Sequence, residues 1–121
     1  MLPDPRDAAH LWDMLQAARD AVRFTGDLSR DDFVADEAEI TRLAVERKLE
    51  ILGEAARRIS PAFRDRHPDI PWRETVGLRN VITHEYGRVN YKEIYGIIRD
   101  RLPELIERLA RLVPLPPETQ E

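Results

Sequence analysis

The stretch "NYKEIYGIIRDRLPELIERLARLV" (residues 90–113) decides the fold class, because its apolar side chains recur every three or four residues. This spacing gathers them on one side of an α-helix, as in a helix that packs against a core. Asn90 and Glu93 resemble a capping box, so the helix is predicted from Tyr91 to the end of the stretch. Pro103 removes one backbone hydrogen bond and is expected to kink or split the helix. The predicted core side chains are Ile94, Ile97, Ile98, Leu102, Leu105, Ile106, Leu109 and Leu112.

The same periodicity continues toward the N-terminus and predicts a first helix. Asp4 is a suitable N-cap, and Pro5 suits the first helical position because its ring already fixes a helical φ. Gly26 is expected just beyond the end of the helix, near Phe24, as a C-cap residue. Its predicted apolar stripe contains Ala8, Leu11, Trp12, Leu15, Ala18 and Val22.

A long second helix is predicted from about Asp36 to Ile59. Gly53 in its middle costs about 1 kcal/mol relative to alanine, so a close helix crossing is expected there. Glu54 could reach a cleft beside that crossing or form an ion pair with an arginine. The side chains expected to face inward include Ile40, Leu43, Ala44, Leu52, Ala55 and Ala56. Those expected to face outward or to line a groove are Arg42, Glu46, Glu50, Arg57 and Arg58.

Residues 60–71 contain three prolines and are expected to form an irregular connection. Pro71 then opens a shorter third helix, which runs into "LRNVITHEYG" (78–87) and ends at the C-cap candidate Gly87. Short connections favour antiparallel neighbours. The sequence therefore predicts an all-α, four-helix, up-and-down bundle with a kinked C-terminal helix, formed by residues 1–113 as one domain, with a flexible tail at 114–121.

Composition restricts the classes of function. The 121 residues contain no cysteine, which excludes disulfides and thiolate metal sites and is compatible with a cytoplasmic location. No apolar run approaches the length that spans a membrane, so no membrane partner is expected. The net charge of −4 disfavours indiscriminate binding to a polyanion. However, residues 47–101 hold twelve Arg and Lys against eight Asp and Glu, which indicates either a local anion-binding surface or solvated helix faces.

The stretch 78–87 gathers the side chains that cleavage of an RNA phosphodiester requires without a metal. The reaction needs a proton carrier and a group that stabilises the extra negative charge on the phosphate oxygens. His84 can carry protons near neutral pH, and Arg79 can hold a phosphate through two parallel hydrogen bonds. Tyr86 could orient the 2′-hydroxyl or a phosphate oxygen, and Asn80 could fix the imidazole or contact the substrate.

Helix geometry complicates this assignment. At about 100° per residue, Asn80 shares a helix face with His84, whereas Arg79 points about 140° away from His84. The two catalytic candidates could converge if Arg79 uses its length, if the helix ends near His84, or if two copies combine across a two-fold dimer. Alternatively, His84 is a structural helix-end histidine favoured by the helix dipole, Arg79 forms a surface ion pair, and Tyr86 is an ordinary half-buried ring.

"RNVITHEY" (79–86) resembles the R-x4-H-x-Y motif of the HepT toxins, a branch of the HEPN ribonuclease superfamily. The resemblance extends over "VERKLEILGEAARRIS" (45–60) and "PWRETVGLRNVITHEYGRVNYKEIYGIIRDRLPELIERL" (71–109). The first 35 residues and the tail match only in character.

The resemblance implies an HEPN-like fold and a metal-independent ribonuclease toxin that acts as a homodimer on RNA and needs no cofactor. It also implies a minimal nucleotidyltransferase antitoxin as partner, which transfers AMP from ATP to the motif tyrosine. On this basis Arg79 and His84 are the expected catalytic residues. Asn80 and Tyr86 are the expected substrate-binding residues, and Tyr86 is also the expected AMP acceptor.

Other interpretations of the sequence remain open. The chain could be a non-catalytic helical partner that presents Tyr86 to a nucleotidyltransferase, or a structural dimer module. The three histidines lie in separate segments without paired ligand spacing, so no metal site is expected. Five further arginines could hold the RNA backbone near the cleft or simply be solvated: Arg57, Arg58, Arg64, Arg66 and Arg73.

Overall fold

The computed structural model describes residues 3–82 and 89–113, and this described part contains helices and no strand. The expected all-α fold class is therefore confirmed. The elements are α1 (Pro5–Thr25), α2 (Arg30–Val34), the 3₁₀-helix η1 (Asp36–Ala38), α3 (Glu39–Arg58), α4 (Pro61–Arg66), α5 (Trp72–Val76), α6 (Leu78–Ile82), α7 (Tyr91–Asp100) and α8 (Leu102–Leu112).

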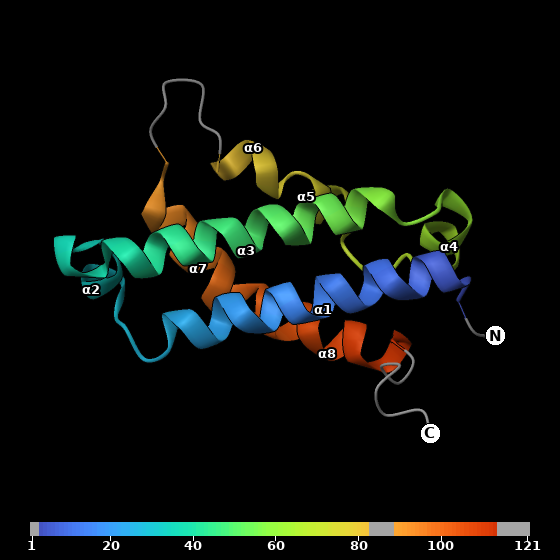
Figure 1. Cartoon of the computed structure of the whole chain (residues 1–121), viewed down its shortest axis with the longest axis horizontal. Helices are drawn as coiled ribbons and strands as arrows, with labels where there is room; N and C mark the ends of the chain where they lie inside the picture. The colour runs from blue at the N-terminus through green and yellow to red at the C-terminus, as the bar shows by residue number, and fades with distance from the viewer. Residues whose placement is uncertain (1–2, 83–88, 114–121) are drawn as a thin grey trace.

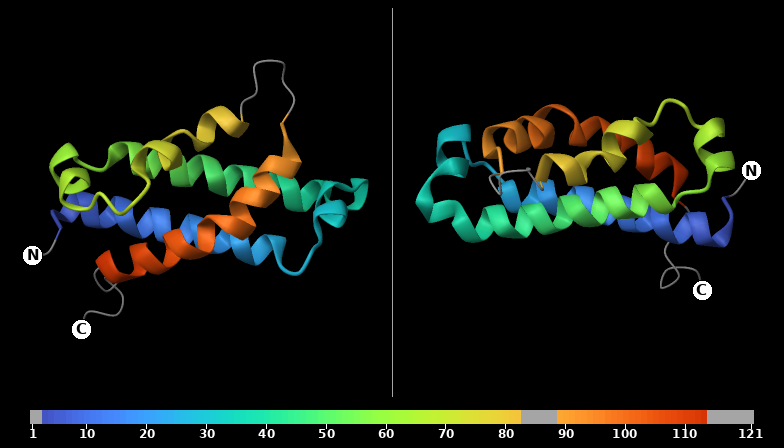
Figure 2. Two further views of the ribbon diagram at one scale, coloured as in Figure 1. Left: turned by 180° about the vertical axis from the view of Figure 1, so that it is seen from behind. Right: turned by 90° about the horizontal axis from the view of Figure 1, so that it is seen from above.

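The two long helices, α1 and α3, run antiparallel and form the centre of the fold (Figure 1). The short helices α5 and α6 pack against α3, and α8 packs against α1 (Figure 2). Helix α7 packs against α8 and α2 and also touches α1. Buried apolar side chains from these helices meet in one core. The most enclosed include Phe33, Leu11, Met14, Leu49, Leu52, Ile94, Ile98, Leu102 and Leu109.

The ends of α1 and α7 follow the predicted caps. The carboxylate of Asp4 accepts a hydrogen bond from the backbone N of Arg6, and α1 ends at Gly26, whose φ of +53° lies in the left-handed region. The side chain of Asn90 accepts a hydrogen bond of 3.1 Å from the backbone N of Glu93. These local signals therefore set the helix boundaries as expected.

The predicted C-terminal helix is split in two, as Pro103 led us to expect. Helix α7 ends at Asp100, Arg101 separates the two pieces, and Pro103 lies in the first turn of α8. A proline is tolerated in that turn because the backbone N–H that it lacks has no intrahelical partner there.

The close crossing expected at Gly53 is present. A Cβ atom at this position would lie 3.2 Å from the carbonyl oxygen of Thr75 and 3.6 Å from that of Val76, both on α5. The third helix differs from the expectation, because it is divided at Gly77 into α5 and α6. The backbone N of Gly77 closes α5 with a hydrogen bond of 3.0 Å to the carbonyl oxygen of Arg73.

For three side chains of α3, the exposed or buried position differs from the one that the sequence pattern predicts. Ile40 and Leu43 were expected to face inward but are 83% and 55% exposed. Arg42 was expected to face outward or to line a groove but is only 8% exposed. Its guanidinium donates to the carbonyl oxygens of Phe33 and Ala35 at the end of the short helix α2, and the oxygen of Ala35 also accepts a hydrogen bond from the backbone N of Ala38. Burial of Arg42 therefore rotates Ile40 and Leu43 toward solvent.

The segment 60–71 is more regular than expected, because it contains α4. Ser60 caps this helix through a hydrogen bond of 3.2 Å from the backbone N of Phe63 to its hydroxyl oxygen, and Pro61 occupies the first helical position. The expectation of a wholly irregular connection was wrong, since a Ser-Pro pair can end one helix and start the next.

Candidate functional site

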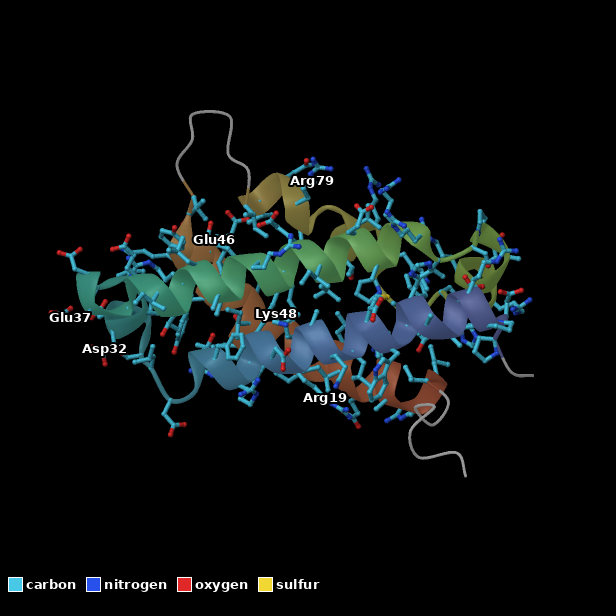
Figure 3. The ribbon with its side chains drawn as sticks, viewed as in Figure 1. Arg19, Asp32, Glu37, Glu46, Lys48 and Arg79 are labelled. Atoms are coloured by element: carbon cyan, nitrogen blue, oxygen red, sulfur yellow. The ribbon has the colours of Figure 1, made fainter. Side chains whose placement is uncertain are left out.

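Helix α6 carries two of the four predicted site residues. Leu78 and Ile82, one turn apart, are buried and hold the helix on the core, whereas Arg79 and Asn80 are exposed. Figure 3 shows Arg79 projecting from α6 on the side away from α3. Arg79 and Asn80 are thus presented at the surface, as a contact with a substrate requires.

The start of α6 packs closely on α3. A Cβ atom on Gly53 would lie 3.8 Å from the backbone N of Arg79, so α3 and the start of α6 are in direct contact at that glycine. The backbone N of Asn80 donates a hydrogen bond of 2.9 Å to the carbonyl oxygen of Gly77. The turn that bears both polar residues is therefore fixed by backbone contacts.

The other predicted site residues, His84 and Tyr86, lie outside the described residues, as does the C-cap candidate Gly87. The structure does place the residues on either side of the segment that carries them. The C-terminal end of α6 before it and the start of α7 after it lie on the same side of α3 (Figures 1 and 2).

A polar cluster on α3 fixes the second of these ends. The hydroxyl of Tyr91 donates a hydrogen bond of 3.0 Å to Oε2 of Glu46, and the guanidinium of Arg42 lies 4.8 Å from the centre of the Tyr91 ring. Sequence reasoning did not foresee this role of Tyr91. The available signal was the i, i+4 spacing of Arg42 and Glu46, which puts both on one face of α3.

Burial raises the pKa of the Tyr91 hydroxyl above its ordinary value, and the hydrogen bond to Glu46 adds to the shift. Tyr91 therefore stays protonated over the physiological range and keeps its hydrogen bond to the carboxylate. Its chemistry suits anchoring of α7 rather than proton transfer.

The interpretation of Glu54 as an ion-pair residue is confirmed. Its carboxylate accepts hydrogen bonds from Arg57, at 2.6 Å and 3.2 Å, and from the Nε of Arg58 at 3.1 Å. These hydrogen bonds, that from Arg57 first, lower the pKa of the Glu54 carboxyl to about 2. Arg57 uses two of its nitrogens in this pair, so its guanidinium is already committed.

The groove between α6 and α7 is acidic. A cavity of about 250 Å³ there is lined by the carboxylates of Glu74, Glu93 and Asp100 and by one cation, Arg101. Repulsion by these carboxylates disfavours an RNA backbone in this groove. A polyanion is therefore expected to approach Arg79 from outside the groove.

Neither a metal cluster nor a membrane span is found in the part of the chain that the structure describes. Among residues 3–82 and 89–113, no group of three or more His, Asp and Glu side chains is arranged to hold a metal ion. None of the described helices has the length and the apolar content needed to cross a bilayer.

Comparison with known families identifies the relatives of this fold and motif. The family model described as "Ribonuclease HepT-like" matches residues 14–112, which is most of the chain. The chain belongs to the HepT-like ribonuclease family. The matched region covers α3, both halves of the third helix and the segment with the R-x4-H-x-Y motif.

Similar proteins from three organisms support this assignment. This HepT-like chain is 39% identical over 97 residues to "Putative RNase MJ1380" of Methanocaldococcus jannaschii, covering 80% of this chain and 87% of that protein. It is 36% identical over 104 residues to "Putative RNase TTE0752" of Caldanaerobacter subterraneus, covering 86% and 91%. It is 33% identical over 103 residues to the "Probable ribonuclease HepT" of Thermococcus cleftensis, covering 85% and 92%. No solved structure matches the chain significantly.

Proposed function

We propose that this HepT-like protein is a metal-independent endoribonuclease in which Arg79 and His84 are the catalytic residues. The observation that carries the proposal is the placement of Arg79, exposed on a helix that packs directly on Gly53. The segment with His84 follows that helix at once, and its far end is tied to α3 through Tyr91. Relatives named as ribonucleases agree with RNA as the substrate.

The proposed reaction is internal transesterification of RNA. The imidazole of His84 takes the proton of the 2′-hydroxyl, and the 2′-oxygen then forms a bond to phosphorus. The bond between phosphorus and the 5′-oxygen breaks, and that oxygen is protonated as it leaves. The products are a 2′,3′-cyclic phosphate and a 5′-hydroxyl end. The guanidinium of Arg79 stabilises the negative charge that builds up on the phosphate oxygens.

The neighbouring polar side chains position the substrate. Asn80 follows Arg79 on α6 and is exposed, so its amide is available to orient the imidazole or to contact RNA. In the proposal, the hydroxyl of Tyr86 orients the attacking 2′-hydroxyl or a phosphate oxygen.

The enzyme is proposed to act as a homodimer. Ile40 and Leu43 lie one turn apart on α3 and expose 83% and 55% of their surface, an unusual position for two large aliphatic side chains. A two-fold interface that covers this patch would bury four such side chains, because each subunit contributes both. It would also allow Arg79 of one subunit to act together with His84 of the other. The two side chains would then not have to converge on one phosphate from a single straight helix.

The regulatory proposal is that a minimal nucleotidyltransferase antitoxin inactivates this toxin by adenylylation of Tyr86. The phenol oxygen of Tyr86 attacks the α-phosphorus of ATP, and pyrophosphate leaves. A nucleotide at this position would block RNA by its volume and by the negative charge of its phosphate. Intact-mass measurement after co-expression with the antitoxin should show one added adenylyl group per chain, and none in the Tyr86→Phe variant.

Arg79→Ala and its matched control Arg111→Ala test the catalytic assignment. Arg111 is exposed on α8, so its substitution removes the same charge away from α6. We expect Arg79→Ala to lose cleavage, Arg111→Ala to retain it, and the products to carry 2′,3′-cyclic phosphate ends. Wild-type cleavage by Arg79→Ala would contradict the assignment. Binding of the nucleotidyltransferase without any cleavage of RNA would instead favour a non-catalytic partner.

A further inference from the structure

A second polar cavity, of about 650 Å³, opens between the first turns of α1, the end of α3 and the start of α4. Its size is within the range of small-molecule binding sites. Four basic side chains line it: Arg6, His10, Arg58 and Arg66. The motif residues on α6 do not contribute to it.

The acidic groups in the same wall are engaged in holding the fold together. Asp4 caps α1 by accepting a hydrogen bond of 2.8 Å from the backbone N of Arg6. Asp7 is only 4% exposed and accepts hydrogen bonds of 2.9 Å and 2.6 Å from the backbone N and hydroxyl of Ser60. Since the carboxylate oxygens of Asp7 face Ser60 and the carboxylate of Asp4 lies 3.9 Å from Nε of Arg6, the excess positive charge of the lining comes from Arg58 and Arg66.

The walls of the cavity are fixed relative to one another. The bonds between Asp7 and Ser60 join the start of α1 to the turn between α3 and α4. Arg64 holds the end of α3 by donating to the carbonyl oxygens of Ala56 and Arg57, at 3.0 Å and 2.8 Å. The basic side chains therefore project from a rigid frame, which reduces the entropic cost of binding a ligand.

The structure shows which of the five further arginines line the cavity and which are engaged elsewhere, a distinction that the sequence could not make. Arg57 binds Glu54 through two nitrogens, and Arg64 binds two backbone carbonyls. Arg58 gives only its Nε to Glu54 and lines the cavity. Arg66 also lines the cavity, with its guanidinium 5.7 Å from the ring centre of Phe63. Arg58 and Arg66 are thus the two of this group that face a space in which a ligand fits.

We propose that this cavity binds a backbone phosphate of a single-stranded RNA whose scissile link lies at Arg79. Guanidinium groups that converge on one space form the usual recognition site for phosphate oxygens. Arg58 lies five residues along α3 from Gly53, about 7.5 Å along the helix axis, and Gly53 is the residue on which α6 packs. The cavity is therefore offset by about one and a half helical turns along α3 from the contact between α3 and α6. This inference rests on the proposed function, because it takes RNA as the substrate.

The test compares Arg58→Gln/Arg66→Gln with the control Arg57→Gln/Arg111→Gln, which removes the same charge from exposed positions that do not line the cavity. Binding of a 2′-O-methylated single-stranded RNA, which lacks the attacking hydroxyl and is not cleaved, is measured over a range of salt concentrations. We expect the cavity variant to bind about five- to tenfold more weakly, with a salt slope smaller by about 0.7 for the one phosphate that is no longer neutralised. We expect the control to change affinity less than about twofold.

Equal affinities and equal salt slopes for the two double variants would overturn the inference. NMR spectra of the His10 ring provide the second arm, with orthophosphate and AMP as probes. Perturbation of the ring by AMP, combined with RNA binding that does not depend on Arg58 and Arg66, would assign the cavity to free nucleotides and overturn the RNA inference. If RNA binding depends on both arginines but the wild-type protein cuts no RNA, the cavity assignment stands and the proposed catalytic function fails.

Discussion

Gly53 on α3 and Arg79 on α6 lie so close that a Cβ atom on the glycine would stand 3.8 Å from the backbone N of the arginine. The same atom would stand 3.2 Å from the carbonyl oxygen of Thr75, which is shorter than ordinary van der Waals contact. A buried structural position, Gly53, thus lies against the backbone of an exposed residue, Arg79, for which a catalytic role is proposed. The helix tolerates a glycine here because any side chain would press α5 and α6 away from α3.

We expect Gly53→Val to lower both stability and activity. The added side chain must displace the backbone of α5 and α6, and overpacking of this kind costs about 1–3 kcal/mol. Cleavage should fall by more than the loss of folded protein accounts for, because Arg79 moves with α6. The measurements are urea unfolding followed by circular dichroism, and the cleavage rate under conditions in which the variant is fully folded.

Gly96→Ala is the matched control for that substitution. Gly96 lies within α7, and a Cβ atom there would meet nothing nearer than 4.0 Å. This variant should be more stable by about 0.5–1 kcal/mol, because alanine suits a helix interior better than glycine. A Gly53→Val protein as active and as stable as wild type would contradict the role assigned to the crossing.

We expect Arg42→Met to destabilise the protein by about 1–3 kcal/mol, because it removes the buried donor of the Phe33 carbonyl oxygen, whereas the oxygen of Ala35 keeps its hydrogen bond from the backbone N of Ala38. Methionine keeps most of the apolar part of the side chain, so the loss of stability measures the contribution of the guanidinium group. Arg47→Met, at an exposed position on the same helix, should change stability by less than about 0.5 kcal/mol. Chemical denaturation of both variants measures the difference, and equal stabilities would contradict the structural role of Arg42.

The local signals in the sequence were sufficient for the caps of α1 and α7, for the break before Pro103 and for the crossing at Gly53, but not for the break at Gly77 or for α4. Asp4, Asn90 and Pro103 act on neighbouring backbone groups, so their effects can be predicted from spacing alone. The burial of Arg42 depends on carbonyl oxygens at the end of another helix, and a periodic pattern carries no information about them. The same pattern assigns Ile40 and Leu43 to the core, because the spacing of apolar residues does not distinguish a face that packs on the core from an apolar face that is exposed in the single chain.

The candidate site was predictable to a similar extent. The exposure of Arg79 and Asn80 follows from the apolar positions of Leu78 and Ile82 on the same helix. The anchoring of the following segment by Tyr91 could not be foreseen, because it depends on where α7 meets α3 in space. The basic cavity likewise joins residues more than fifty positions apart, through the bond between Asp7 and Ser60.

Tyr91 is expected to make the free energy of unfolding depend on pH in the alkaline range. Its hydroxyl has a raised pKa in the folded state, so the folded protein holds this proton more tightly than the unfolded chain does. The stabilisation is complete below the pKa of the unfolded chain, about 10, and is lost as the pH rises through the higher folded pKa. Unfolding free energies measured from neutral to alkaline pH should show this decline, and Tyr91→Phe should reduce it. An unchanged alkaline profile in Tyr91→Phe would contradict the assignment.

We expect Ile40→Asp/Leu43→Asp to dissociate the proposed homodimer. Both side chains are exposed in the single chain, so their replacement should leave the stability of the subunit within about 0.5 kcal/mol. Charges placed on both sides of a two-fold interface repel one another and lose the apolar contact. Sedimentation velocity over a range of concentrations should show dimers for wild type and for the control Ala110→Asp, which alters an exposed position on α8, and monomers for the double variant. A wild-type monomer at all concentrations would contradict the dimer.

The most direct test of the account is cleavage of RNA by His84→Ala in EDTA. Without the imidazole, the 2′-hydroxyl loses its proton acceptor, and the rate should fall at least about a hundredfold while the circular dichroism spectrum stays that of wild type. The matched control is His67→Ala, at the end of α4, which should cleave at close to the wild-type rate. RNA cleavage by His84→Ala at the wild-type rate, with products carrying the same ends, would contradict the assignment of His84 as the proton carrier.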